Sequence, residues 1–341
     1  MWRTARNIET KHRDTYFQFV RGICMVVVVL IHSKASNATD GWELGYWLSI
    51  RQMTNFAVAT FVFMAGYFAK PYILCGGGYK RLIRLGIPYI LWSMFYCFSN
   101  GEYNLLNIGA KIVQGTASVQ LYYMVILIEL TIITPALWIS IESRAVNISI
   151  LLLTPLYLLV VSFLQYSNGV SLPWKGRDFV AWIAFYYLGM LVRHYNWKVR
   201  MSISKSVVCV IISFLLSFAE GCFVYRSFQN SGLAISQIKI SSFVFALSVI
   251  NLFMKLHDKV RIEDSNWLVK VGNVSFGIYF MHPFVIRCEE YLLNYIGMSA
   301  SIPLPVYHVG QTLFTVCICY MVIGGINFVD KKRIVGWLIG V

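Results

Sequence analysis

The chain has 341 residues, of which 58% are hydrophobic and 13% are charged, whereas a soluble domain typically carries about 25% charged residues. So much apolar surface cannot be hidden inside a soluble globule, which excludes a soluble enzyme and predicts that lipid is the solvent. The formal net charge of +14 sits in short basic clusters between apolar runs, a pattern typical of membrane topology and not of nucleic-acid binding.

Apolar segments of about membrane-spanning length follow one another along the whole chain, and no hydrophilic segment is long enough to form a second domain. We therefore predict an all-α fold, with residues 1–341 forming a single integral membrane domain of about ten transmembrane helices. The segments 1–16 and 330–341 are predicted to be cytoplasmic. The predicted spans are 17–34, 54–74, 86–100, 119–140, 147–165, 179–193, 205–225, 237–255, 272–293 and 308–329.

The distribution of Lys and Arg predicts the orientation of these helices. With ten spans and a cytoplasmic N-terminus, 21 of the 29 Lys and Arg residues fall on the inner side. An even number of spans then places both termini in the cytoplasm. A cleaved signal peptide ending near Ala38 is the alternative interpretation of the first span, but its removal would put every later basic cluster on the wrong side.

The first span carries two polar residues, Arg21 and His32, at a depth where such groups are expensive. Eleven residues make almost three helical turns, so both side chains lie on one face, about 16 Å apart along the axis. Arg21 falls near the cytoplasmic boundary and His32 falls toward the outer side. The alternative is that Arg21 snorkels to the interface and His32 marks the end of the span.

A second candidate feature is the cytoplasmic basic cluster Lys80–Arg84. Arg81 and Arg84 are three residues apart and face the same way if the segment is helical. Two guanidinium groups side by side suit phosphate or pyrophosphate. The alternative is an ordinary positive-inside cluster.

Two more ionisable residues fall inside later spans. His282 precedes a proline in the segment Ser275–Pro283, and Glu129 lies in the middle of the fourth span, where it needs a partner or a proton. Each is also compatible with a purely structural role. The eight cysteines form no CxxC pair, so we expect neither a zinc site nor a disulfide framework.

Four segments spread along the chain resemble the membrane-bound acyltransferase family 3. The segment Phe19–His32 is similar to that family's first-helix signature of an arginine, ten residues and a histidine. Arg81–Arg84 matches its cytoplasmic RxxR motif. Phe61–Phe68 resembles its second-span segment, and Ser275–Pro283 is similar to its late SxGIYxxH segment. The short chain without an appended domain is most similar to the enterobacterial common antigen O-acetyltransferase type.

The resemblance implies transfer of an acyl group, acetyl from acetyl-CoA, to a hydroxyl of a cell-surface polysaccharide or lipid-linked glycan in a bacterial inner membrane. It implies that Arg81 and Arg84 hold the phosphates of the acyl-CoA donor. His32 would be the general base, and Arg21 would orient the donor or balance negative charge. His282 and Glu129 are possible supporting residues. The expected partners are acyl-CoA, the glycan acceptor and the lipid bilayer, with no permanently bound cofactor, no metal and no nucleic acid.

The competing class is a transporter or exporter of polysaccharide or lipid-linked sugar, because ten spans with buried charges also fit that function. The chain shows no repeated halves with broken spans at matching positions, which argues against a transporter. A membrane sensor without catalysis would not need the Arg81 and Arg84 pair.

Overall fold

The computed structural model describes residues 14–33, 41–71, 79–168, 177–297, 302–330 and 334–340. Within these ranges every regular element is a helix, which confirms the predicted all-α fold. Residues 1–13 and 331–333, which belong to the predicted terminal segments, lie outside the described residues.

The helices follow the apolar segments closely. In chain order they are α1 (Thr15–His32), α2 (Gly41–Thr54), α3 (Phe56–Tyr67), α4 (Tyr79–Ser99), α5 (Leu105–Gln114), α6 (Tyr122–Ile139), α7 (Arg144–Asn168), η2 (Phe179–Ala181), α8 (Ile183–His194), α9 (Ile203–Phe228), α10 (Ser231–Ala234), α11 (Ile240–His257), α12 (Trp267–Asn273), α13 (Ser275–Tyr295), α14 (Leu304–Val329) and α15 (Ile334–Ile339).

Seven helices in the described part of the chain, α1, α4, α6, α7, α9, α11 and α14, are long and apolar enough to cross a membrane. The other three predicted spans coincide with helices that miss this standard. Helices α3 and α8 have 12 residues each, and α13 carries Arg287, Glu289 and Glu290 toward its end. Helix α3 nevertheless continues a longer helical segment, because only the single residue Asn55 separates it from α2.

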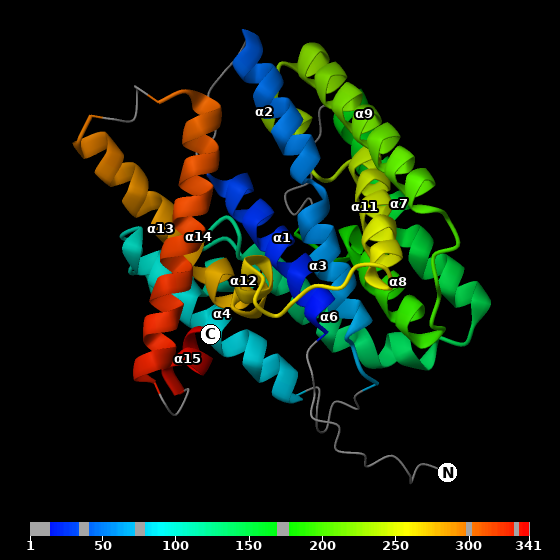
Figure 1. Ribbon diagram of the computed structural model, residues 1–341, viewed down its shortest axis with the longest axis horizontal. Coiled ribbons are helices and arrows are strands. Elements are labelled where there is room, and N and C mark those ends of the chain that lie inside the picture. The colour runs from blue at the N-terminus through cyan, green and yellow to red at the C-terminus, as the bar shows by residue number, and fades with distance from the viewer. Residues whose placement is uncertain are drawn as a thin grey trace.

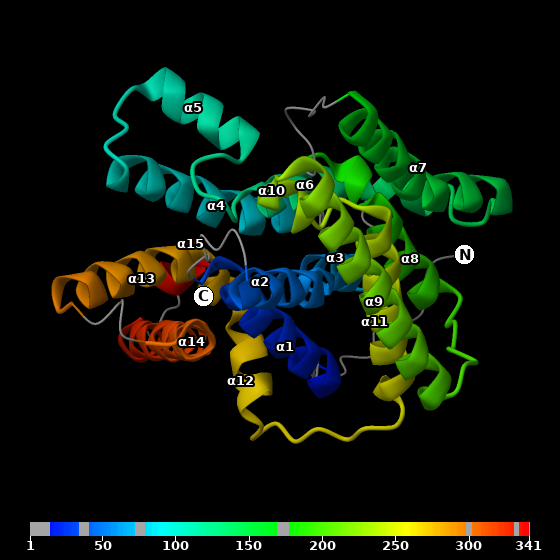
Figure 2. The same cartoon turned by 90° about the horizontal axis from the view of Figure 1, so that it is seen from above.

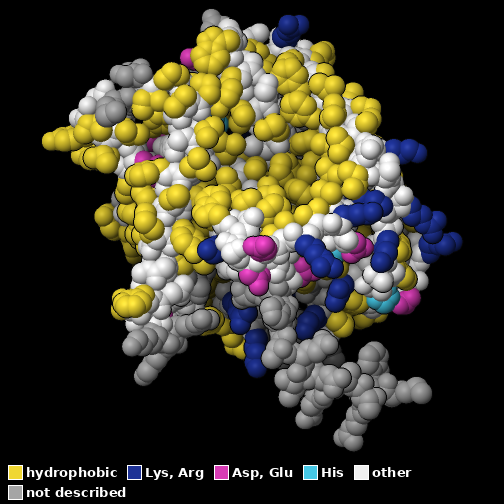
Figure 3. Space-filling view, viewed as in Figure 1, with side chains coloured by type: hydrophobic (Ala, Val, Ile, Leu, Met, Phe, Trp, Pro, Cys, Tyr) yellow, Lys and Arg dark blue, Asp and Glu magenta, His cyan; other side chains and the backbone are white. Residues whose placement is uncertain are grey.

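The outside of the bundle is apolar. Helix α7 exposes Leu152, Leu156 and Phe163, and α9 exposes Ile211 and Leu215. Figure 3 shows hydrophobic side chains over most of the visible face, with Lys, Arg, Asp and Glu gathered along the side on which α1 begins. Continuous exposed apolar surface of this extent belongs against lipid, so this is a membrane protein.

Helices α1, α2 and α3 pass through the middle of the molecule (Figures 1 and 2). Helix α1 packs against α12, α13, α3 and α14, while α3 packs against α8 and α11. Seen from above, α13 and α14 lie on one side of this central group and α7, α9 and α11 lie on the other (Figure 2). A residue on α1 or α3 is therefore surrounded by protein from several directions.

Two close helix crossings fix the central helices, and each depends on a pair of glycines. A Cβ at Gly22 of α1 would lie 1.9 Å from the Leu268 carbonyl oxygen, and one at Gly272 of α12 would lie 1.9 Å from the Gln18 carbonyl oxygen. The second crossing joins α3 to α8, where a Cβ at Gly66 would lie 1.8 Å from the Tyr186 carbonyl oxygen. Only glycine lets the backbones approach this closely.

Candidate active site

The two histidines predicted to matter come together inside the bundle. His32 is the last residue of α1, and His282 lies on α13. Their ring centroids are 5.2 Å apart. His282 is fully buried, whereas His32 is half-buried and so keeps an accessible face. The structure thus pairs residues that are 250 positions apart in the sequence.

The sequence around His282 fixes which of its nitrogens carries the proton. Helix α13 continues through Pro283, which has no N–H to donate to the carbonyl of Tyr279. The His282 Nδ1 lies 3.1 Å from the Ile278 carbonyl oxygen and also interacts with the Tyr279 carbonyl. Because a carbonyl only accepts, Nδ1 is the protonated nitrogen. Nε2 is left as an acceptor, and no described residue donates a hydrogen bond to it.

The end of α1 that carries His32 is capped by side chains from other helices. The last carbonyls of a helix have no partners within it. Here the Ser33 amide donates to the Val29 carbonyl at 2.9 Å. Nε2 of His308 donates to the Leu30 carbonyl at 2.8 Å, and Nη1 of Arg51 donates to the Ile31 carbonyl at 2.8 Å. These contacts from α14 and α2 hold His32 in place.

Arg51 is also an electrostatic neighbour of His32. It lies on α2, and its guanidinium carbon lies 5.4 Å from the centroid of the Trp47 ring, one turn earlier on the same helix. Sequence reasoning missed Arg51 as a site residue because it treated the residues before 54 as an outer loop. The spacing of Trp47 and Arg51, which places them on one helical face, is the signal that was available.

Arg21 and Arg81 both lie near the end of α3, at the end of the bundle that is predicted to be cytoplasmic and is called the inner end below. The guanidinium carbon of Arg21 lies 5.4 Å from the centroid of the Phe68 ring, just after α3. Nη2 of Arg81 lies 3.5 Å from the Ala65 carbonyl oxygen near the end of α3. Both arginines act electrostatically on Tyr123 of α6. A helix C-terminus attracts cations, which explains why both side chains turn toward this point.

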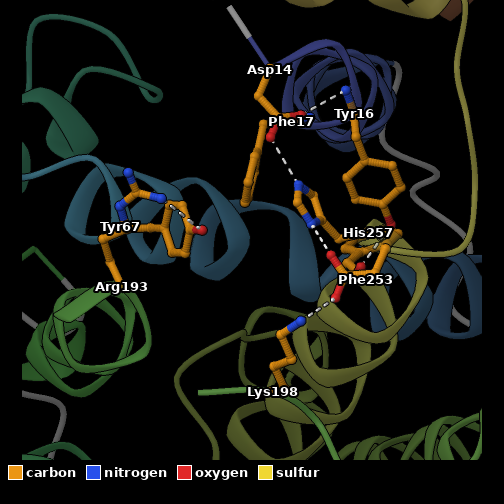
Figure 4. Close-up of polar contacts among 9 residues, drawn as sticks. Asp14, Tyr16, Phe17, Tyr67, Arg193, Lys198, Phe253 and His257 are labelled. Atoms are coloured by element: carbon orange, nitrogen blue, oxygen red, sulfur yellow. Dashed lines mark hydrogen bonds and ion pairs between the residues drawn. The ribbon is translucent and has the colours of Figure 1, made fainter. Parts of the chain in front are cut away.

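Arg84 lies on α4, one turn after Arg81, and is exposed. The segment that carries the two arginines is therefore helical, which is the condition on which their common direction was predicted. The structure adds a further arginine that the sequence did not single out: Arg193 of α8 lies over the Tyr67 ring at 5.4 Å, with Nη1 3.5 Å from the Tyr67 hydroxyl. Figure 4 shows Arg193 and Tyr67 side by side.

An aromatic group lies among these arginines. Phe17, Tyr67 and Phe68 contact one another, with centroid distances of 4.8 Å, 5.0 Å and 5.2 Å. Phe17 is buried, but 41% of Phe68 is exposed. The inner end of the bundle therefore presents an exposed aromatic ring next to Arg21, with further arginines close by.

Aromatic side chains connect the inner arginines with the histidine pair. The ring of Tyr123 lies 5.7 Å from that of Tyr279, and the Tyr279 ring lies 6.3 Å from that of His282. Both Tyr123 and His32 keep accessible surface although they lie in the interior. The described side chains thus form a series of electrostatic and ring contacts, called the route below, that links Arg21 and Arg81 to His32.

Glu129 lies away from the members of this route. It points from α6 toward η2, where it interacts with Asp178 and the Phe179 backbone. One of its carboxylate oxygens, Oε2, is buried and receives no hydrogen bond from a described residue. The structure thus pairs His32 with His282, places Arg21 and Arg81 near the end of α3, and places Glu129 on another side of α6.

A polar network anchors the inner end of α1 (Figure 4). The Asp14 carboxylate caps the helix by accepting from the Tyr16 and Phe17 amides. His257, at the end of α11, bonds to Asp14 at 2.8 Å and to Asp258 at 3.1 Å. The hydrogen bond from His257 lowers the pKa of the Asp258 carboxyl. Both ends of α1 are therefore fixed by contacts to other helices.

Comparison with known proteins gives one match. A family model described as an acyltransferase domain, the acyltransferase 3 family, matches residues 14–324. No curated protein and no solved structure significantly matches the chain. The matched range contains every residue of the route from the inner arginines to the histidine pair.

Proposed function

This chain belongs to the acyltransferase 3 family and is an acyltransferase, and on that premise we propose that it transfers an acetyl group from acetyl-CoA to a hydroxyl of a cell-surface polysaccharide or lipid-linked glycan. The observation that carries the proposal is the contact between His32 and His282 at one end of a route whose other end is lined by Arg21 and Arg81. A base and a phosphate-binding group are the two parts that acyl transfer from a CoA thioester requires.

The proposed topology has ten spans, with α2 and α3 forming one of them and α8 and α13 completing the count. Both termini are then cytoplasmic, in the inner membrane of a bacterium. Two observations support this topology. Charged side chains gather on the side of the molecule where α1 begins (Figure 3), and an excess of Lys and Arg is expected on the cytoplasmic side.

In this proposal the donor binds at the inner end. Arg81 and Arg84 hold the phosphates of CoA, because guanidinium groups match phosphate oxygens in geometry and charge. Arg193 adds a further cation at the same end of α3, and Phe68 offers a face on which the adenine ring stacks. The pantetheine arm then follows the route past Tyr123 toward His32.

His32 acts as the general base. Its unprotonated nitrogen takes the proton from the acceptor hydroxyl as the oxygen attacks the thioester carbonyl carbon. The new C–O bond forms, the C–S bond breaks, and the imidazolium returns the proton to the departing CoA thiolate. The products are the ester and free CoA.

His282 positions His32 in this scheme. Its Nδ1 is engaged by the carbonyls of α13, which leaves Nε2 as an acceptor without a donor among the described residues. An N–H of His32 that points to this acceptor leaves the other His32 nitrogen free to take a proton.

One assay tests the proposal. Membranes containing the protein are incubated with acetyl-CoA labelled in the acetyl group and with a lipid-linked glycan fraction from bacterial membranes, and label on the glycan is measured. We expect label that depends on the protein and is lost on His32→Ala. Movement of glycan across the membrane without labelling would instead establish a transporter.

A further inference from the structure

Arg51 is a cation in the interior of the bundle whose hydrogen-bonding capacity is only partly used. Nη1 donates to the Ile31 carbonyl at 2.8 Å. Nε is buried and has no hydrogen-bond partner among the described residues. A guanidinium has five N–H donors in a fixed plane. Among the described residues, Ile31 is thus the one hydrogen-bond partner of this guanidinium, and its remaining N–H groups can donate to a bound ligand.

Arg51 also has no carboxylate partner among the described residues. The ion pairs among the described residues lie at helix ends. They join Glu102 to Lys111, Glu142 to His194, Asp14 to His257, Asp258 to His257 and Asp258 to Lys198. The groups that interact electrostatically with Arg51 are His32, Tyr122 and His308. An interior cation without a counter-ion is costly, which indicates that an anion forms beside it during function.

The backbone that carries Arg51 is held rigidly by the next residue. Gln52 is fully buried, and its Oε1 accepts hydrogen bonds from Asn55, Ser217 and Lys239 at 3.1, 2.8 and 3.2 Å. Its Nε2 donates to the Ala234 carbonyl at 2.8 Å. The end of α2 is therefore tied to α9, α10 and α11 before any substrate binds. A donor fixed in advance does not have to reorganise when charge develops.

We propose that Arg51 stabilises the oxyanion of the tetrahedral intermediate formed next to His32. When the acceptor oxygen attacks, the C–O bond forms and the carbonyl π electrons move onto oxygen, creating the negative charge. That charge lies beside the guanidinium until the electron pair returns and the C–S bond breaks. This inference rests on the proposed function and adds a catalytic residue to it.

The test compares Arg51→Gln and Arg51→Lys with the wild type, measuring kcat and KM with acetyl-CoA and the bacterial lipid-linked glycan fraction, per amount of folded protein. Removing one oxyanion donor typically lowers kcat by about 10²–10³-fold. We expect that loss for Arg51→Gln, with both KM values within about threefold of the wild type. Arg51→Lys keeps the charge and should recover at least about tenfold.

Two further variants separate catalysis from helix capping. His308→Ala removes the neighbouring cap on α1. The kcat of this variant should remain at least about tenfold higher than the kcat of Arg51→Gln. Arg226→Gln removes an exposed arginine at the end of α9 and should keep wild-type kinetics. If Arg51→Gln keeps wild-type kcat, raises only KM for the glycan, or matches His308→Ala, the inference is wrong. Absence of transfer by the wild type would instead refute the proposed function.

Discussion

The two ends of α1 are built differently. At the His32 end, carbonyls of the helix are capped by His308 and Arg51, and His282 beside it is fully buried. At the Arg21 end, cations from three helices surround α3, and Phe68 is 41% exposed. A closed, fixed end suits bond-making, and an open, charged end suits recognition of a soluble donor. The proposed function uses this difference by giving separate tasks to the two ends of one helix.

The largest effect is expected at the closed end. His32→Ala should lower kcat by about 10²–10⁴-fold, because a positioned general base contributes that much. KM for acetyl-CoA should stay within about threefold, since the proposed function places the phosphates of the donor at the other end. The measurement is steady-state transfer of labelled acetyl by purified protein of equal folded fraction.

His194→Gln is the matched control, because this histidine lies at the end of α8 and bonds to Glu142 at 2.9 Å. It should keep wild-type kcat. Equal losses of kcat in His32→Ala and His194→Gln would contradict a catalytic role for His32.

The sequence predicts the structure of the two ends of α1 to different extents. Hydrophobic length was enough to predict that the apolar segments form helices, and helical spacing predicts a common face for Arg21 and His32. The contact of His32 with His282 is a tertiary packing of distant segments, and no local pattern indicates it. Arg51 was missed because it lies on α2, the helix that precedes the apolar segment. Helix α2 is only modestly hydrophobic, so a search for apolar spans does not find it.

The prediction of individual spans was limited because a segment is recognised as a span only by its length and hydropathy. Helices α3 and α8 are short, yet the glycine crossing at Gly66 and Gly189 packs them tightly in the centre. Length and hydropathy together therefore give seven candidate spans in the described residues, and a helix surrounded by protein does not need a fully apolar surface. Glu129 was singled out by depth, but depth does not reveal which side of α6 it faces.

The next effect is expected at the open end. Replacing Arg81 and Arg84 together by Ala should raise KM for acetyl-CoA by about 10-fold or more, because charge-assisted hydrogen bonds contribute about 1.5–3 kcal/mol each. kcat at saturating donor should stay within about threefold. Kinetics over a range of acetyl-CoA concentrations measure both values.

Lys205→Ala supplies the control, since Lys205 is an exposed cation in the first turn of α9. Its KM should equal that of the wild type. A double variant with unchanged KM would contradict donor binding by these arginines.

A smaller effect is expected from the exposed ring. Phe68→Leu keeps an apolar side chain but removes the stacking face, and loss of a base–aromatic stack costs roughly 1–3 kcal/mol. KM for acetyl-CoA should rise at least about fivefold. Phe98→Leu, at the outer end of α4, changes an equally exposed ring and should have no effect on KM. Similar behaviour of the two variants would show that the adenine lies elsewhere.

The smallest effect is expected from the network that anchors α1. Asp258→Asn removes an exposed ion pair with His257, so the loss of stability should be no more than about 1 kcal/mol. Because the folded state lowers the pKa of Asp258, its contribution is present above the ordinary carboxyl pKa and is lost as the pH falls through the lowered value. Thermal unfolding in detergent should show a small difference at pH 7 that shrinks below about pH 4. A difference that grows in acid would contradict this sign.

The division of tasks along α1 is tested most directly by the side from which the donor acts. Sealed vesicles of known orientation, carrying lipid-linked glycan, are supplied with labelled acetyl-CoA from outside only. The account predicts transfer in inside-out vesicles, where the Arg21 end faces the donor, and no transfer in right-side-out vesicles until they are made permeable. Equal transfer in both orientations, or transfer only in right-side-out vesicles, would contradict it.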